Sequence, residues 1–348
     1  MKRLSSSVKT ILGSILAVTL LVTLTIFVFK KPKENVSDTS KTLNVLNWTS
    51  YIPLEVIKDF EKESGIKINY GTYSSNEELL AKLVSSAEGT YDLVFPSDYM
   101  VDLMSSRDMI VPLDKSKLKN LENVSPLFLG QSYDEENKYS LPFLLATTVF
   151  LYDSTKLPRL TSYKDLLNEK LKNNLILLDD QRIIIGAMLQ ATGRPMNDVR
   201  EDSLEDSLNF FEKLKPNIKA FDSDSPKTFF ITKEVDAGLV WNAEALIAVE
   251  ENPDLKISYP AEGFALSMDN YCLVKGGKNH DAAYLFIDYL LRPDVAQKIV
   301  DEYPYISAIK GVDTVPENEL IEILNNGSYV ENVGADIKKF DKLWAKYK

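Results

Sequence analysis

The chain contains one cysteine and one histidine, and this scarcity excludes several kinds of site. A single cysteine, Cys272, cannot form an internal disulfide. Zinc sites built on cysteine and histidine need more ligands than these two residues supply. Catalysis through histidine would depend on His280, which lies in the turn-like run GGKNHD and which we interpret as a surface residue. We therefore expect no zinc site and no histidine-based catalytic centre.

Basic residues are also scarce once the N-terminal segment is set aside. The whole chain has 40 basic and 51 acidic residues, a net charge of −11. Residues 1–41 hold seven of the basic and two of the acidic residues, so the remainder carries 33 basic and 49 acidic residues, or −16. Such a charge repels nucleic acid and favours cationic ligands through its summed field. The negative charge is explained equally well if its only role is to keep the protein soluble.

Charged residues are absent from residues 10–29. An apolar-biased run of this length can span a bilayer as a helix. The run has basic residues on both sides, ends without a small-residue cleavage site, and is not followed by a cysteine for lipid attachment. We predict a cytoplasmic n-region over 1–9, an uncleaved signal anchor over 10–29 and a polar tether over 30–41. A cleaved signal peptide is the alternative.

The following sequence alternates strand and helix patterns. Strands predicted at 43–48, 66–73 and 91–96 are each followed by a helix pattern, and the first helix ends at Gly65. This alternation favours a parallel or mixed sheet with helices on both faces. Later in the chain, the patterns predict helices at 161–170, 183–192, 202–214, 280–300 with a break at Pro293, and 335–348, and strands at 175–180, 238–240 and 257–260.

Two long apolar runs, 139–152 and 264–274, are typical of strands that cross from one domain to another. The sequence thus predicts an α/β protein of two lobes joined by a hinge, a shape that closes on a ligand between the lobes. The predicted lobes are 42–147 plus 265–312, and 148–264 plus 313–348.

Aromatic, hydroxyl and acidic side chains follow several of the predicted strands. In α/β sheets, ligands bind beyond the carboxyl ends of the strands. Aromatic faces attract ammonium groups and cover methylene chains, and carboxylates bind ammonium groups through charge-assisted hydrogen bonds. Together these residues describe a slot for a linear alkyl polyamine. They are Trp48, Thr49, Tyr51, Ser97, Asp98, Tyr99, Asp179, Asp180, Trp241, Asn242, Glu244 and Asp269.

Each of these residues also has a purely structural interpretation. A tryptophan after a strand is more often a packing residue. The pair Asp179 and Asp180 is as consistent with a helix cap as with a ligand contact. Glu244 at a helix start could act only on the helix dipole.

The order and spacing of the motifs resemble the substrate-binding proteins of spermidine/putrescine ABC transporters. The resemblance runs almost end to end from Leu43. It is carried by NWTSYIP, YGTYSSNEELLAKL, YDLVFPSDYMVDLM, ILLDD, FDSD at 221–224, GLVWN, MD at 268–269 and LLRPDVA. It implies the two-lobed periplasmic-binding-protein fold with an interlobe cleft, here preceded by the N-terminal transmembrane helix. It further implies capture of a polyamine, spermidine and/or putrescine, and its delivery to a membrane permease, without covalent chemistry or a cofactor.

The resemblance also assigns ligand contacts residue by residue. The family's ring and hydroxyl contacts fall on Trp48, Thr49, Tyr51, Ser97 and Tyr99, and Trp241 matches a wall aromatic. Asp180 and Asp269 match anionic contacts to the ligand nitrogens. Glu244 lies where some putrescine-binding members carry an acid.

Three positions depart from the family pattern. Ile183 stands where the family often has an acid, Ser267 where it has an aromatic residue, and Val330 where a glutamine can reach the ligand. We expect such changes either to alter which spacing of amines the pocket accepts or to give weaker binding or a different cation.

Other functions share parts of this pattern. They are a same-fold receptor for another ligand such as a small cation, an amino acid or a metal complex, a ligand sensor, and a surface hydrolase with a carboxylate pair. An anionic ligand is disfavoured because Arg182 is the only arginine in the strand-end loops. We expect a monomer at the periplasmic or extracellular face of the cell membrane.

Overall fold

The first described strand is apolar along most of its length, and the sheet of the first lobe is built around it. In the computed structural model, which describes residues 41–312 and 314–348, β1 (Thr42–Trp48) buries Leu43, Val45 and Leu46. It pairs in parallel with β2 (Lys67–Tyr73) and β3 (Leu93–Val94). The helices that follow these three strands are α2 (Leu54–Ser64), α3 (Asn76–Ser85) and α4 (Asp98–Ser106). The predicted alternation of strands and helices is confirmed.

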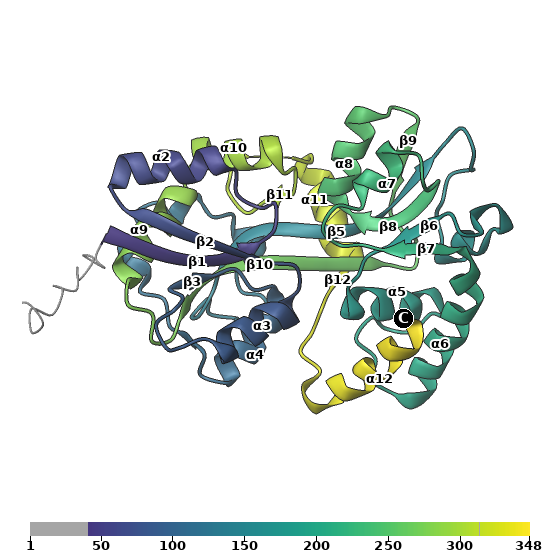
Figure 1. Ribbon diagram of the computed structural model, residues 1–348, viewed down its shortest axis with the longest axis horizontal. Helices are drawn as coiled ribbons and strands as arrows, with labels where there is room; N and C mark the ends of the chain where they lie inside the picture. The colour runs from purple at the N-terminus through teal and green to yellow at the C-terminus, as the bar shows by residue number, and fades with distance from the viewer. Residues whose placement is uncertain (1–40, 313) are drawn as a thin grey trace, which may run out of the picture. The chain divides into compact units, whose positions relative to one another are not determined.

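Two long antiparallel strands run through both lobes (Figure 1). They are β5 (Leu141–Asp153) and β10 (Phe264–Val274), and nearly every residue of each is buried. The sheet order is β2-β1-β3-β10-β5-β8-β6-β7, so these crossing strands lie at its centre. Shorter strands extend them: β10 pairs with β4 (Ile110–Val111) and β12 (Gly327–Tyr329), and β5 pairs with β9 (Leu255–Ser258) and β11 (Ile306–Ser307).

The second lobe repeats the parallel arrangement around β6 (Leu175–Leu177), which lies between β7 (Ile218–Phe221) and β8 (Ala237–Trp241). Its helices are α5 (Gln181–Ala191), α6 (Glu201–Leu214), α7 (Lys227–Ile231), α8 (Asn242–Glu251) and α12 (Ile337–Tyr347). The C-terminal helix α12 packs on α5 and α6, and the ring of Tyr347 stacks on Phe211 with 3.7 Å between ring centroids.

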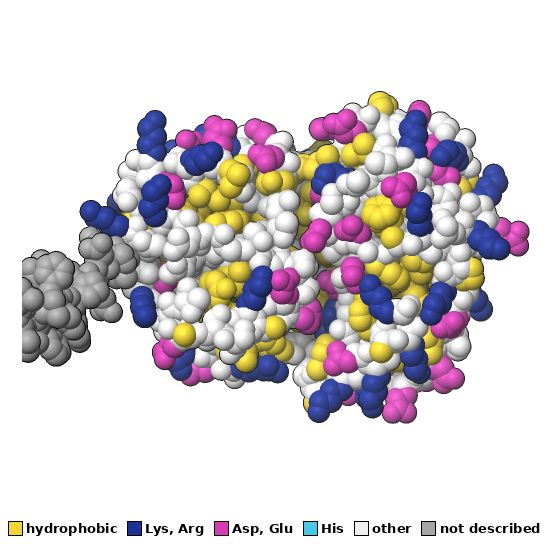
Figure 2. Space-filling model, in the orientation of Figure 1, with side chains coloured by type: hydrophobic (Ala, Val, Ile, Leu, Met, Phe, Trp, Pro, Cys, Tyr) yellow, Lys and Arg dark blue, Asp and Glu magenta, His cyan; other side chains and the backbone are white. Residues whose placement is uncertain are grey.

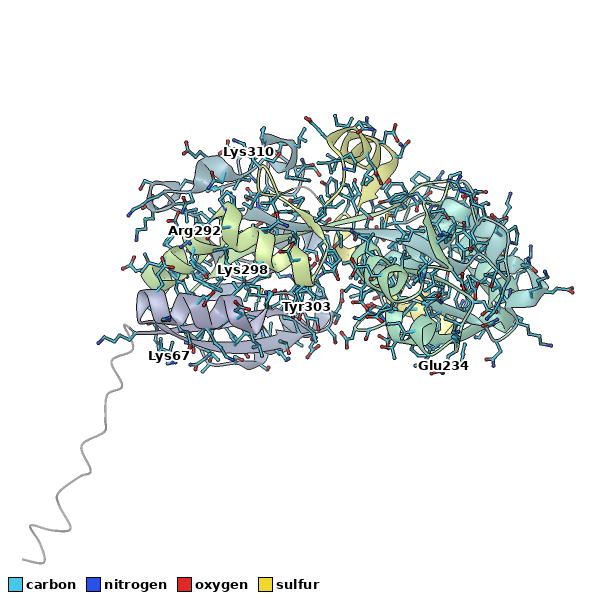
Figure 3. The ribbon with its side chains drawn as sticks, turned by 90° about the horizontal axis from the view of Figure 1, so that it is seen from above. Lys67, Glu234, Arg292, Lys298, Tyr303 and Lys310 are labelled. Atoms are coloured by element: carbon cyan, nitrogen blue, oxygen red, sulfur yellow. The ribbon has the colours of Figure 1, made fainter. Side chains whose placement is uncertain are left out.

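Helix α10 (Pro293–Glu302) is separated from α9 (His280–Leu290) at the predicted break. Ion pairs join α10 to α2: Lys298 contacts Asp59 at 2.7 Å and Arg292 contacts Glu63 at 3.1 Å. Figure 3 shows Arg292 at the start of α10 and Lys298 on this helix, beside α2. Because these pairs are exposed to solvent, they contribute little to stability. The chain leaves α10 at Glu302 and then enters β11.

Some sequence predictions are wrong. Residues 161–170 form two short 3-10 segments, Tyr163–Leu167 and Glu169–Leu171, instead of one helix. The reason is local: Asn168 has φ −58° and ψ 129°, and its side chain caps the second segment. The third strand is shorter than predicted, and α7, β4, β7, β11, β12 and α11 (Glu317–Asn326) were not predicted.

The predicted n-region, signal anchor and most of the tether lie outside the described residues. In residues 41–312 and 314–348, no helix has both the length and the apolar character needed to cross a membrane. The lobe boundaries given by the sequence pattern remain predictions.

Two glycines allow a prediction about stability. Gly65 ends α2 in the left-handed conformation, φ 72°, and a Cβ there would meet nothing within 4 Å. At Gly238, in β8, a Cβ would lie 2.6 Å from Ile176 Cγ2 and 2.9 Å from the Ile176 carbonyl oxygen. We expect Gly65→Ala to cost about 1 kcal/mol through backbone strain and Gly238→Ala to cost about 2–3 kcal/mol through overpacking.

Urea unfolding of the full chain measures both values. The Gly65 variant is the matched control, since it adds the same methyl group where space is open. A Gly238→Ala variant as stable as the Gly65→Ala variant would contradict this account of the contact between β6 and β8.

Candidate functional site

One pocket is lined by the nine residues that the resemblance assigned as ligand contacts, whereas Asp98, Asp179 and Asn242, which the strand-end pattern also singled out, do not line it. The lining residues come from the ends of β1 and β8, from the first turns of α4, α5 and α8, and from the middle of β10. Both lobes therefore contribute to its walls. The nine residues are Trp48, Thr49, Tyr51, Ser97, Tyr99, Asp180, Trp241, Glu244 and Asp269.

The three positions that depart from the family pattern line the same pocket. Ile183 lies on α5, Ser267 on β10, and Val330 directly after β12. Val330 and Ile183 are buried and give this part of the wall an apolar surface. The pocket also contains residues that the sequence analysis did not single out as contacts, namely Ser50, Ser74, Asn76, Ala146, Arg182, Ser223, Asp224 and Tyr305.

Asp269 is the most enclosed carboxylate that lines the pocket. Its residue is 3% exposed, and its two oxygens accept hydrogen bonds from Ser97 Oγ, at 2.6 Å, and from the Tyr51 hydroxyl. An isolated antiparallel bridge between Ser97 and Asp269 sets this contact. Burial raises the pKa of Asp269 to about 7, although both hydrogen bonds act in the opposite direction. A cation that enters the pocket would therefore find a carboxylate whose ionised form lacks a charged partner.

Asp180 is both a helix cap and a pocket residue. Its Oδ1 accepts a hydrogen bond from the backbone N–H of Ile183 at 3.0 Å, which caps α5. Desolvation by the surrounding protein raises the pKa of Asp180 to about 6, and Glu77 adds to this effect. The two interpretations left open by the sequence are therefore compatible, because the cap uses only one carboxylate oxygen.

Aromatic rings form one wall of the pocket. Trp48 and Trp241 are partly exposed, and the Trp48 indole N–H donates to the Phe95 carbonyl at 2.9 Å. The ring of Tyr51 packs against that of Tyr305 with 4.8 Å between centroids. The sequence analysis missed Tyr305, although its segment, EYPYIS, repeats the pattern of aromatic residues next to a strand.

Arg182 lines the pocket but is bound within its own surroundings. Its guanidinium donates to Asn197 Oδ1 at 3.2 Å and to the Glu331 carbonyl at 2.9 Å. It also lies over the rings of Tyr99 and Phe340, at 5.5 and 4.7 Å from their centroids. The Arg182 guanidinium is therefore held in place by cation–π contacts with aromatic rings and by hydrogen bonds to uncharged acceptors.

Glu244 is held by a lysine. Lys227 Nζ, at the start of α7, donates to both carboxylate oxygens of Glu244, at 2.7 and 2.8 Å. The Glu244 side chain is 7% exposed and that of Lys227 is 24% exposed. Burial raises the pKa of Glu244, and the contact with Lys227 opposes this shift. The sequence analysis did not identify Lys227.

A second hollow adjoins the pocket and is acidic. It shares Ser74, Asp180, Ser223 and Asp224 with the first. Figure 2 shows acidic side chains on both sides of the boundary between the lobes. A field of one sign in such a hollow raises the local concentration of cations. The carboxylates that line it are Glu77, Asp179, Asp180, Asp222 and Asp224.

The fold and the site together define a two-lobed α/β binding protein whose pocket is lined by carboxylates and aromatic rings. The model of the family described as bacterial extracellular solute-binding protein matches residues 55–322, and the chain belongs to this family.

Relatives with known names agree with this class. The chain is 34% identical over 323 residues to the spermidine/putrescine-binding periplasmic protein of Escherichia coli, covering 90% of this chain and 93% of the relative. It is 30% identical over 282 residues to a putrescine/cadaverine-binding protein of Pseudomonas aeruginosa, covering 76% and 78%. The structure of the spermidine/putrescine ABC transporter substrate-binding protein PotD from Streptococcus pneumoniae superposes with a TM-score of 0.75 at 31% identity, covering 88% of this chain and 98% of that one.

The raised pKa of Asp269 predicts a pH dependence of stability. Below about pH 4 the carboxyl is protonated in both the folded and the unfolded chain. Between pH 4 and 7 the unfolded chain loses this proton while the folded chain keeps it, so the free energy of unfolding falls as pH rises. A shift from 3.8 to about 7 corresponds to about 4 kcal/mol.

We expect Asp269→Asn to abolish the part of the decline in the free energy of unfolding that comes from Asp269. Urea unfolding at pH 4 to 8 measures it, with Asp301→Asn, an exposed aspartate on α10, as the matched control. Parallel pH profiles for wild type and Asp269→Asn would show that Asp269 titrates normally and would contradict the prediction.

Proposed function

We propose that this protein is the extracytoplasmic ligand-binding component of an ABC importer and that it captures a polyamine. The observation that carries the proposal is the placement of two desolvated carboxylates, Asp180 and Asp269, in one pocket with the rings of Trp48, Tyr51 and Trp241. A polyamine has the complementary form, because charged ammonium groups alternate with apolar methylene chains.

The ammonium groups would replace water with charge-assisted hydrogen bonds to Asp180 and Asp269. The methylene chain between them would lie on the aromatic wall, where cation–π attraction also acts. The hydroxyls of Thr49, Ser97 and Tyr51 are available as acceptors for further ammonium protons. These assignments of ligand contacts are part of the proposal.

The proposed cycle requires binding alone. The polyamine enters between the lobes, the lobes close on it, and the closed form docks on a permease, which receives the ligand. The protein acts at the periplasmic or extracellular face as a monomer, held to the membrane by residues 10–29, and makes no covalent change to its ligand. The names of the relatives support the importer role and the polyamine.

A thermal-unfolding titration tests the proposal directly. We expect spermidine, putrescine or cadaverine, in moderate salt, to stabilise the full chain by about 2.7 kcal/mol at a hundred times the dissociation constant. Arginine serves as a comparison cation. Asp180→Ala and Asp269→Ala should each weaken binding at least about 100-fold, since a buried ammonium would lose its partner.

The exposed variant Asp301→Asn is the control for a general change in charge. Polyamine affinity unchanged in both pocket variants would reject the proposed contacts. The absence of a shift with all three polyamines would reject the proposed ligand and leave the fold as described.

Binding should also release protons. An ammonium partner favours the ionised carboxylate, so it lowers the pKa of Asp269 and Asp180 from about 7 and about 6. At pH 6 we expect up to about 1.4 protons released for each ligand bound, about 0.9 from Asp269 and about 0.5 from Asp180. From pH 6 to 8, the affinity should rise about tenfold through Asp269.

Calorimetry in two buffers with different ionisation enthalpies measures the released protons. Asp269→Asn should reduce the number, whereas Asp301→Asn should not. Equal heats in the two buffers for the wild-type chain would mean that both carboxylates are already ionised before the ligand arrives.

A further inference from the structure

The Lys227–Glu244 pair has the chemistry of a bound ligand. A primary ammonium, carried on a chain of four methylene groups, donates to both oxygens of a nearly buried carboxylate at 2.7 and 2.8 Å. An amine of a polyamine would make the same contact. The difference is that this ammonium belongs to the protein.

A tethered ammonium has an advantage over a free one. It loses no translational and rotational freedom when it binds, and its effective concentration at the carboxylate is in the millimolar range or above. Among the described residues, Glu244 is the hydrogen-bond partner of the Lys227 ammonium. A ligand that displaced Lys227 would therefore leave that ammonium without its partner in a partly buried position, which is unfavourable.

The charges around the pocket indicate how many ligand cations fit. Among the described residues that line it, four are carboxylates: Asp180, Asp224, Glu244 and Asp269. Arg182 lines the same pocket and Lys227 neutralises Glu244. Four negative and two positive charges leave two negative charges for a ligand to balance. A dication balances them, whereas a trication leaves an excess positive charge.

We infer that Lys227 takes the position of a ligand amine at Glu244, so that the pocket selects diamines over triamines. The inference rests on the proposed function, since it names the subclass of polyamine that the same pocket takes. Asp180 and Asp269 are then the anchors for the two ligand ammonium groups. Lys227 acts as a specificity residue, through the carboxylate that it occupies.

The experiment compares two ligands by calorimetry on the full chain at one pH and one moderate salt concentration. We expect the wild-type chain to bind 1,4-diaminobutane at least about tenfold more tightly than spermidine. Lys227→Met keeps the length of the side chain and removes its charge, which frees Glu244. In that variant the ratio of spermidine to diamine affinity should rise at least about tenfold.

Two further variants isolate the mechanism. Adding Glu244→Gln to Lys227→Met removes the freed carboxylate, so the ratio should return to the wild-type value. Lys227→Arg keeps the charge and should keep the diamine preference. Lys219→Met is the matched control, because Lys219 pairs with Glu234 at 3.3 Å and neither residue lines the pocket.

The outcomes separate this inference from the proposed function. A wild-type chain that binds the triamine as tightly as the diamine overturns the inference, and this measurement does not depend on the folding of any variant. A Lys227→Met chain that binds the diamine with an unchanged ratio also overturns it, while the receptor function stands. If the wild-type chain binds neither ligand, the proposed function fails and the inference fails with it.

Discussion

The structure depends most on the free-energy cost of burying the ionised carboxylate of Asp269 in the pocket. Asp269 lies on a central crossing strand, and its oxygens receive hydrogen bonds from two neutral hydroxyls, those of Ser97 and Tyr51. Neutral donors stabilise the ion less than a cation does, so the pKa stays near 7. The pairing register between β5 and β10 shifts at this position, between Asp269 and Asn270. The sheet is irregular at the residue that carries the buried charge.

The second desolvated carboxylate comes from the other lobe. Asp180 follows β6 and caps α5, whereas the hydroxyls that hold Asp269 come from the ends of β1 and β3. A ligand with two ammonium groups would thus join one lobe to the other through its two ends. Such a ligand stabilises the arrangement in which both carboxylates face it, and this differential affinity is what shifts a population toward closure. Recognition and closure would then depend on the same two contacts.

The sequence was informative where function depends on local position. Trp48, Ser97 and Trp241 could be placed because each follows an apolar strand, and strand ends meet at one edge of a sheet. Lys227 was missed because its contact with Glu244, 17 residues further on, depends on how α7 packs on α8. Tyr305 was missed although its segment carries an aromatic pattern, because the ring of Tyr51 that it packs against lies far away in the chain. The helix predicted at 161–170 was wrong for a different reason: one residue with a non-helical backbone, Asn168, interrupts an otherwise helical pattern. Short strands such as β11 and β12 exist only because β5 and β10 offer them an edge.

The two cations of the protein next to the pocket show how selectivity can be set without changing the anchors. Arg182 gives its hydrogen bonds to an amide and a main-chain carbonyl, and within residues 41–312 and 314–348 Asp180 makes no ion pair. Lys227 donates two hydrogen bonds to the Glu244 carboxylate, which is then not available to a ligand. The negative charge that remains after the protein's own cations are counted, more than the number of carboxylates present, would determine how many ligand amines the pocket balances. A single lysine can therefore alter ligand choice while the aromatic wall and both anchors stay the same.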